Sequence, residues 1–319
     1  MSAQRGDRWT GILALVLMGL FAPPVMAQQS EGADGSAPES EDAPASGEET
    51  DKPRPVVRSG TGDEALAAHR SDRAVWLETP EHGRLLALLE REQAANAKGA
   101  VLILADEGQS ADTGLAGALR EPLSKAGWAA LSMGLPEPPQ QVVRARRHPA
   151  MAMEGDKETA GQEDPANEEA DAVMIDVMDP TELDDLTETY RSRIDAYVSA
   201  ALERLSSEGY SPVVLVGVGY GASAMARHTG SATALVWVAP QMSESALEAF
   251  QPGAPVLELY PNRQQTQARQ RSAQLKRQQL PSYRQQPVAM DAQPQRRDAG
   301  QVANRMLSWL RSLAEKGRR

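Results

Sequence analysis

Residues 213–221 read Val-Val-Leu-Val-Gly-Val-Gly-Tyr-Gly, an apolar run that passes into three glycines at alternate positions. A short continuous apolar run is typical of a strand buried on both faces, as in a parallel sheet covered by helices. The small residues that follow, up to Arg227, favour a short helix packed closely against that strand. The stretch therefore predicts a strand, a tight turn and a helix at the centre of an α/β domain.

The same pattern recurs on both sides of this stretch. Further strands are predicted at 74–77, 85–89, 99–105, 128–133, 234–238, 255–260 and 283–290, and further helices at 111–126, 190–208, 243–250, 263–279 and from Asp298 onward. Because crossovers between parallel strands are right-handed, this alternation predicts a doubly wound, mostly parallel sheet with helices on both faces. The first two strands have no helix between them and predict an antiparallel hairpin at the amino-terminal edge of the sheet.

The amino terminus predicts export. Residues 1–27 carry two arginines, then an apolar run, and then two prolines shortly before Ala27. A charged start, a short apolar stretch and small residues at its end are typical of a secretory signal peptide. We expect cleavage near Ala27 and a periplasmic location; an uncleaved anchor is the alternative, which the prolines disfavour. The chain has no cysteine, which excludes disulfides and a lipidated cysteine anchor.

Two segments differ in composition from the α/β domain, which is expected over 72–319. Residues 28–71 are rich in Glu, Ser, Ala, Pro and Gly and lack aromatic residues, which predicts a disordered acidic linker. Residues 136–190 interrupt the alternation and carry 15 acidic residues against four Lys or Arg, which predicts a mobile acidic insertion. The methionines of this insertion, with His148, are interpreted as covering an apolar patch rather than binding copper(I), and no metal or cofactor is predicted.

The formal net charge of −11 is unevenly distributed. Residues 261–319 carry 13 Lys or Arg against three acidic residues, opposite in sign to the insertion. Export, and the lack of aromatic residues interleaved with the basic ones, argue against a nucleic-acid partner. We favour the interpretation that the basic segment faces the acidic insertion within one molecule. Weak contact of this basic carboxyl-terminal region with an anionic membrane surface is the alternative.

The glycines of the central turn match the nucleophile elbow Gly-x-Ser-x-Gly, except that its middle position is Gly219. Here the chain resembles the α/β-hydrolase superfamily over about 72–317. More narrowly, it resembles the proteobacterial domain-of-unknown-function family 3530, whose members pair a Gly-x-Gly-x-Gly turn with an earlier Asp-x-Gly-Gln-Ser segment. That segment is present at 106–110, after the strand that leads into the oxyanion loop of hydrolases.

The resemblance implies a serine, an acid and a histidine in that chain order. The serine position is Gly219, which has no side chain. The turn at 261–263, where the acid is expected, reads Pro-Asn-Arg, and Glu244 is the only near substitute. Residues 229–319 contain no histidine, and His228 is interpreted as a favourable cation at the end of a helix. The sequence therefore predicts that a Ser-His-Asp triad is absent.

Two other serines keep an enzymatic alternative open. Ser223 follows the turn on the next helix, and Ser110 lies in the oxyanion-type loop, where it is more readily a cap for the following helix. A displaced nucleophile at either position would make the protein a serine hydrolase of the esterase or amidase type.

We favour a periplasmic protein that lacks the triad and acts as a binding or scaffold protein of the cell envelope. Its partner would be a small anionic or carbonyl ligand, or an envelope protein. The backbone amides of the two motifs are expected to form the floor of a ligand pocket. The candidate pocket residues are Asp106, Gly108, Gln109, Ser110, Gly217, Gly219, Tyr220 and Gly221.

Overall fold

The computed structural model describes residues 62–147 and 180–316, except 252, 279 and 281. The predicted signal peptide, most of the predicted linker and residues 148–179 lie outside the described residues. No described helix combines the length and the apolar character needed to cross a membrane.

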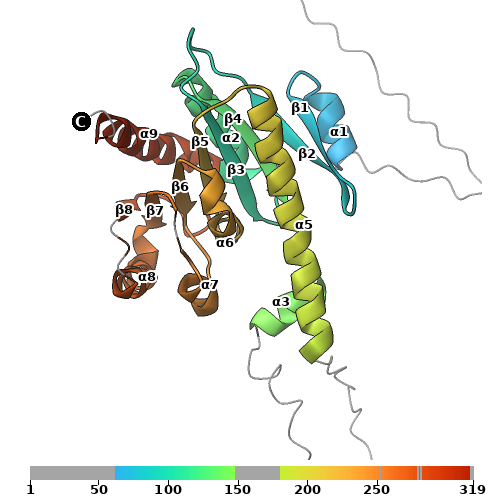
Figure 1. Ribbon diagram of the computed structural model, residues 1–319, viewed down its shortest axis with the longest axis vertical. Coiled ribbons are helices and arrows are strands. Elements are labelled where there is room, and N and C mark those ends of the chain that lie inside the picture. Colours follow the sequence, from blue (N-terminus) through green and yellow to red (C-terminus); the bar gives the residue numbers. More distant parts are fainter. Residues whose placement is uncertain (1–61, 148–179, 252, 279, 281, 317–319) are drawn as a thin grey trace, which may run out of the picture. The chain divides into compact units, whose positions relative to one another are not determined.

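A single eight-stranded sheet forms the centre of the described domain (Figure 1). Its strands are β1 (Ala74–Thr79), β2 (Gly83–Glu90), β3 (Ala100–Glu107), β4 (Ala129–Leu135), β5 (Val213–Val218), β6 (Ala234–Val238), β7 (Val256–Pro261) and β8 (Tyr283–Val288). Their order is β1-β2-β4-β3-β5-β6-β7-β8. Strand β2 pairs antiparallel with both β1 and β4, and all other pairs are parallel. The predicted doubly wound sheet and its antiparallel edge hairpin are confirmed.

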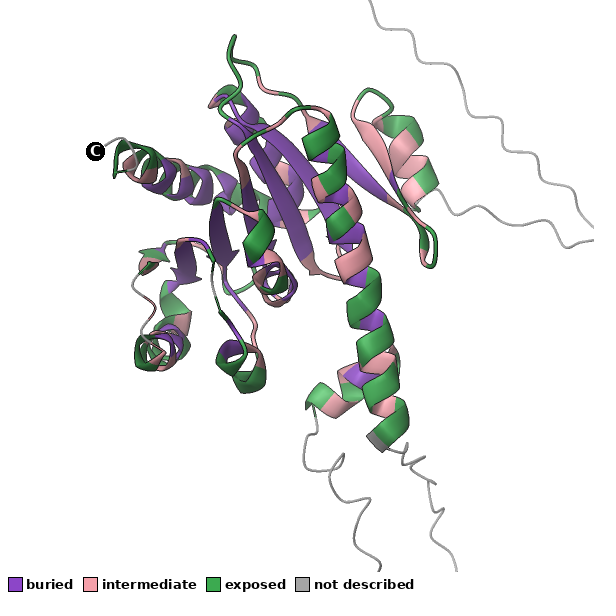
Figure 2. Cartoon of the chain, in the orientation of Figure 1, coloured by how far each residue is buried: buried purple, intermediate pink, exposed green. Residues whose placement is uncertain are grey.

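Helices cover both faces of this sheet. They are α1 (Asp63–His69), α2 (Gly114–Lys125), α3 (Gln140–Arg147), α5 (Pro180–Ser207), α6 (Gly221–Met225), α7 (Glu244–Glu248), α8 (Gln265–Arg277) and α9 (Ala299–Lys316), with short 3-10 helices η2 (Ala226–Ser231), η3 (Asn262–Gln264) and η4 (Arg296–Asp298). Helices α5, α6, α7 and α8 contribute to the core on one face, and α2 and α9 to the core on the other. The buried strands lie between these two layers (Figure 2).

Most positions of the central strands are apolar because alternate side chains enter different layers. On β3, Leu102 and Leu104 belong to the core beneath α5, whereas Val101 and Ile103 belong to the core beneath α2 and α9. All four side chains are fully buried. This double burial explains why continuous apolar runs located the strands correctly.

The structure differs from the sequence expectations at three helices. Helix α1 forms within the segment predicted to be a disordered linker. It is held on the domain because Leu66 packs against the cluster that contains Leu86, and because the Asp63 carboxylate accepts a hydrogen bond from the Leu86 N–H (3.2 Å). Within the predicted insertion, 140–147 forms α3, and α5 begins at Pro180, ten residues before the expected start. Proline suits the first turn of a helix, but these polar turns carry too few apolar residues to be recognised by periodicity.

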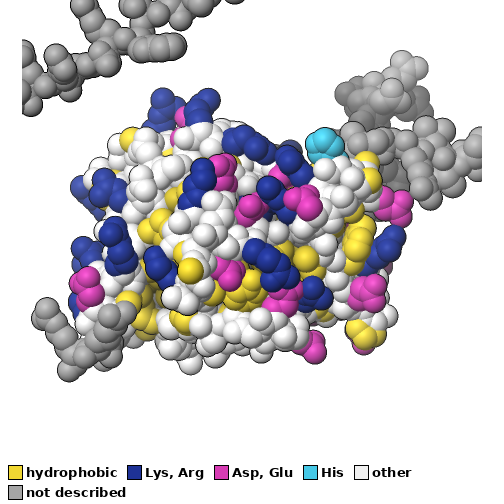
Figure 3. All heavy atoms as spheres, turned by 90° about the horizontal axis from the view of Figure 1, so that it is seen from above, with side chains coloured by type: hydrophobic (Ala, Val, Ile, Leu, Met, Phe, Trp, Pro, Cys, Tyr) yellow, Lys and Arg dark blue, Asp and Glu magenta, His cyan; other side chains and the backbone are white. Residues whose placement is uncertain are grey.

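Charges on the described surface are mixed. On the face shown in Figure 3, Lys and Arg side chains alternate with Asp and Glu side chains and with apolar ones. The expected approach of the basic segment to residues 148–179 lies outside the described residues.

Candidate functional site

The turn between β5 and α6 has the tight geometry that its glycines predict. Gly219 has a φ of 55°, a left-handed conformation that glycine adopts without strain. Its N–H donates to the Val238 carbonyl oxygen (3.0 Å), and its own carbonyl accepts from the Gln241 N–H (3.0 Å). Two bonds to the segment around the end of β6 therefore hold the turn in place.

The flanking glycines allow strand and helix to approach closely. A Cβ atom at Gly217 would lie 2.4 Å from Ala222 Cα, and one at Gly221 would lie 2.5 Å from the Ala105 carbonyl oxygen. Both distances are shorter than any van der Waals contact, so neither position accepts a side chain without backbone movement. The flanking positions of an elbow are thus retained.

The space above the middle position is filled by another residue. A Cβ atom at Gly219 would lie 2.3 Å from Cγ and from both carboxylate oxygens of Asp106. Asp106 Oδ1 accepts hydrogen bonds from the backbone N–H groups of Tyr220 and Glu107, both at 2.9 Å. The Asp106 carboxylate therefore stands where the side chain of an elbow residue would stand.

The register of the sheet explains this contact. Strands β3 and β5 are parallel neighbours, and Leu104 pairs with Gly217. Two residues further along each chain, Asp106 and Gly219 emerge side by side at the carboxyl edge of the sheet. Neither motif alone reveals this contact, because it depends on which strands are neighbours.

One of the two N–H groups that bind Asp106 has a known counterpart in elbow chemistry. In an α/β hydrolase, the oxyanion hole consists of the N–H after the nucleophile and an N–H from the loop after the third strand. The first of these is here the Tyr220 N–H, and Asp106 Oδ1 already accepts its hydrogen bond; Oδ1 also accepts from the N–H of Glu107, the last residue of β3. Burial raises the pKa of the Asp106 carboxyl, although the two donors oppose that shift.

A second layer of polar contacts covers the turn. Arg146 on α3 binds both carboxylate oxygens of Glu107 (2.7 and 2.9 Å), and its guanidinium lies over the Tyr220 ring, 4.9 Å from the centroid. Tyr190 on α5 donates to the Pro136 carbonyl oxygen (2.8 Å). Arg146 and Tyr190 were not among the predicted site residues, since no local spacing connects the insertion with a turn far along the chain.

The predicted pocket residues separate into two groups. Asp106, Gly217, Gly219, Tyr220 and Gly221 meet at the turn, and the Tyr220 amide predicted to bind a ligand is bound by Asp106 instead. In the other group, the backbones of Gly108 and Gln109 bond to Leu135, at the end of β4. Ser110 lines a separate hollow of about 450 Å³ together with His69.

The capping role expected for Ser110 is wrong. Helix α2 begins at Gly114, and its N-cap residue is Thr113. Ser110 accepts a hydrogen bond from the Thr113 N–H through its own carbonyl (3.3 Å), and its hydroxyl lies 3.5 Å from the Thr113 hydroxyl. Three residues of loop separate Ser110 from the first residue of α2. The sequence alone did not show where this helix begins.

His228 and Ser223 do not form a catalytic pair in the described hydrogen bonds. His228 lies in η2, and its Nε2 pairs with Asp195 on α5 at 3.1 Å. Asp195 also accepts from Arg227 (2.6 Å). Burial acts to raise the pKa of Asp195, but the hydrogen bonds from His228 and Arg227 outweigh it and lower this pKa. This ion-pair cluster fastens the end of the α6 segment to α5.

A mostly parallel sheet in this strand order, with a Gly-x-Gly-x-Gly turn after β5, defines an α/β-hydrolase-like protein. The described residues contain no group of three or more His, Asp or Glu placed to hold a metal ion. The chain belongs to DUF3530, a family of proteins of unknown function, whose family model matches residues 11–312. Both levels of the predicted resemblance are confirmed.

Comparison with solved structures gives hydrolases. They include a dienelactone hydrolase from Anabaena variabilis, with 19% identity over 75% of this chain and 96% of that chain and a TM-score of 0.49. An α/β serine hydrolase without a lid from Xanthomonas campestris shares 13% identity over 75% and 94% (TM-score 0.48). An esterase domain from Rhodothermus marinus shares 14% over 75% and 98% (TM-score 0.48). No sequence among the curated proteins matches the chain.

Proposed function

We propose that this protein is a periplasmic binding or scaffold protein of the cell envelope that uses the α/β-hydrolase fold without serine-hydrolase catalysis. One observation carries the proposal: the Asp106 carboxylate fills the position of the nucleophile side chain and binds the Tyr220 N–H, the donor that follows the elbow position.

The physical argument concerns what catalysis at this turn would require. Acyl transfer needs a nucleophile, a base within hydrogen-bond reach and free donors for the developing oxyanion. Gly219 supplies no nucleophile, and the Tyr220 N–H, the donor that follows the elbow position, is already bound by Asp106 Oδ1. A substrate carbonyl would have to displace a carboxylate held by two hydrogen bonds. The arrangement therefore favours a stable turn over a reactive one.

A direct test is exposure of the purified protein to a fluorophosphonate probe and to short acyl esters, with an authentic serine hydrolase as positive control. We expect no covalent adduct and no ester hydrolysis above the buffer rate. Intact-mass measurement detects an adduct at whichever residue it forms. An adduct that peptide mapping places on any serine contradicts the proposal.

The second candidate function is a serine hydrolase with a displaced nucleophile. It is favoured by the common hollow that Ser110 and His69 line, because a histidine is the usual base for a serine. Ser223 is half-buried on α6 and has no such neighbour among the described hydrogen bonds. If the probe reacts, Ser110→Ala abolishes labelling and Ser223→Ala preserves it.

Export is part of the proposal and has its own test. We expect the mature protein to begin near Gln28, because the small residues before it suit cleavage after Ala27. Mass spectrometry of the protein from a periplasmic fraction measures this terminus. An intact Met1 in the cell-associated protein contradicts it.

A further inference from the structure

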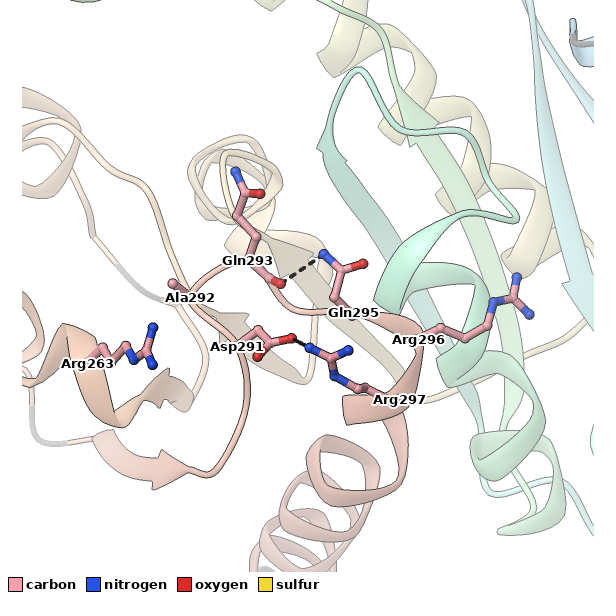
Figure 4. Close-up of a pocket in the computed structure, with 7 residues that line it drawn as sticks. All are labelled: Arg263, Asp291, Ala292, Gln293, Gln295, Arg296 and Arg297. Atoms are coloured by element: carbon pink, nitrogen blue, oxygen red, sulfur yellow. Dashed lines mark hydrogen bonds and ion pairs between the residues drawn. The ribbon is translucent and has the colours of Figure 1, made fainter.

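A hollow of about 880 Å³ lies where β7 and β8 end (Figure 4). The two strands are parallel neighbours, paired from Val256 with Tyr283 to Pro261 with Val288. Ligands of open α/β sheets bind outside the carboxyl ends of their strands. The hollow is lined by Arg263, Asp291, Ala292, Gln293, Gln295, Arg296 and Arg297.

The walls of this hollow are held in place by the protein itself. The buried carboxylate of Asp298 accepts hydrogen bonds from the backbone N–H of Gln295 (2.8 Å) and of Asp291 (3.4 Å). Across the hollow, the Gln264 side-chain amide donates to the Ala292 carbonyl oxygen (3.2 Å). The bonds of Asp298 fold the segment after β8 on itself, and the bond of Gln264 ties this segment to the one after β7. The backbone that carries these side chains is therefore fixed before any ligand arrives, which reduces the entropy lost on binding.

The lining carries an excess of positive charge. Arg297 pairs with Asp291, and Figure 4 shows Arg263 reaching toward the same region from the other side. Arg296 donates to the neutral carbonyl oxygen of Asp112 (2.7 Å), which leaves its charge uncompensated. Arg263 has no hydrogen bond or ion pair with any residue that the structure describes. Two guanidinium groups thus lack an acidic partner in the described part of the chain.

The side chains of the lining favour binding of a polar anion. Guanidinium groups bind phosphate and carboxylate oxygens through paired N–H donors. The side-chain amides of Gln293 and Gln295 add donors, and none of the seven lining residues is aromatic. A phosphate group at neutral pH carries about −1.5 to −2 charges, which matches two uncompensated guanidinium groups better than a single carboxylate does.

A second hollow extends this surface. Arg296 lines both the larger hollow and the one of about 450 Å³ that contains His69 and Ser110. A ligand with more than one phosphate group can therefore extend past Arg296 and place phosphate groups in both hollows.

We propose that this arginine-lined hollow binds a molecule bearing two or more phosphate groups. The inference supplies a ligand class for the proposed binding role and rests on it, but it does not depend on the absence of hydrolase activity. A soluble phosphorylated compound and a phospholipid headgroup share this chemistry, and the experiment distinguishes them.

The test measures binding of inorganic tripolyphosphate to the full chain by calorimetry at about 0.15 M ionic strength, where the Debye length is about 8 Å. Arg263→Gln/Arg296→Gln is expected to weaken binding by about tenfold or more, because both uncompensated charges of the lining are lost. Arg305→Gln/Arg311→Gln on the exposed side of α9 removes the same charge outside the hollow. This control is expected to change the affinity by less than about twofold, since charges beyond a Debye length are screened.

Further measurements decide whether the ligand is a soluble compound or a lipid headgroup, and whether the hollow prefers phosphate to other anions. Binding of tripolyphosphate, but not of vesicles that contain cardiolipin, a lipid with two phosphate groups, supports a soluble ligand. Vesicle binding alone, lost in the hollow variant and kept in the control variant, supports a headgroup. Equal weakening in both variants, citrate binding as tightly as tripolyphosphate, or no binding to either probe overturns the proposal. Fluorophosphonate labelling of a serine would contradict the absence of hydrolase activity but not phosphate binding in the hollow, so the two proposals can fail independently.

Discussion

Replacing Gly219 by alanine is expected to lower the free energy of unfolding by about 3–5 kcal/mol, since a left-handed backbone conformation and an overpacked contact each cost about 1–3 kcal/mol. The new Cβ would lie 2.3 Å from the Asp106 carboxylate, which is held by two N–H donors and cannot move without losing them. Urea unfolding followed by circular dichroism at neutral pH measures the change.

The structure offers a matched control for the backbone part of this effect. Gly209 also has positive φ (82°), and a Cβ there would meet no atom within 4 Å. Gly209→Ala is therefore expected to cost only about 1–2 kcal/mol, the strain of the left-handed conformation. If Gly219→Ala is as mild as Gly209→Ala, the carboxylate does not occupy the elbow position.

A double-mutant cycle isolates the contact itself. Asp106→Ala leaves the Tyr220 and Glu107 N–H groups without their acceptor and costs about 1–3 kcal/mol. In the double variant the added methyl group enters space that the carboxylate has left. The two losses are therefore expected to be less than additive, by about 1–3 kcal/mol. Strict additivity would contradict the direct contact on which the proposed function rests.

The second large effect is expected at a buried ion pair beneath β7. Glu258 is fully buried, and its Oε1 accepts from Arg271 Nη2 (2.8 Å) and Nε (3.2 Å) on α8. Its Oε2 accepts from the Tyr283 hydroxyl and from the Gln285 amide (3.2 Å). Burial and the neighbouring Glu258 raise the pKa of Tyr283, so its hydroxyl keeps the proton that it donates. All four donors converge on one carboxylate.

Arg271→Met is expected to lower the free energy of unfolding by about 3–5 kcal/mol, because it leaves an uncompensated charge in the interior. Arg269→Met on the same helix removes an exposed arginine and is expected to change stability by less than about 0.5 kcal/mol. Adding Glu258→Gln to Arg271→Met removes the buried charge but keeps acceptors for Tyr283, so part of the stability should return. Equal effects of the two arginine variants in urea unfolding would contradict this account.

Much of the fold was predictable because its signals are local. The central strands are almost continuously apolar, so β3 up to Ala105 and β5 stand out from the chain before any pairing is known. The amphipathic stripe of α9 and the glycines of the turn are equally local patterns. Helices α1 and α3 are short, and contacts with distant residues hold them in place. Periodicity therefore could not locate them.

The sequence by itself determined the fold class, the turn after β5 and the absence of a side chain at Gly219, because each depends on residue type and near neighbours. Tertiary structure alone decided what replaces that side chain. Asp106 reaches Gly219 only because β3 and β5 are parallel neighbours with Leu104 opposite Gly217. In the same way, the ends of β7 and β8 bring Arg263 and Arg297 to one hollow. Strand order and register position both sites, and neither order nor register can be predicted from a short stretch of residues.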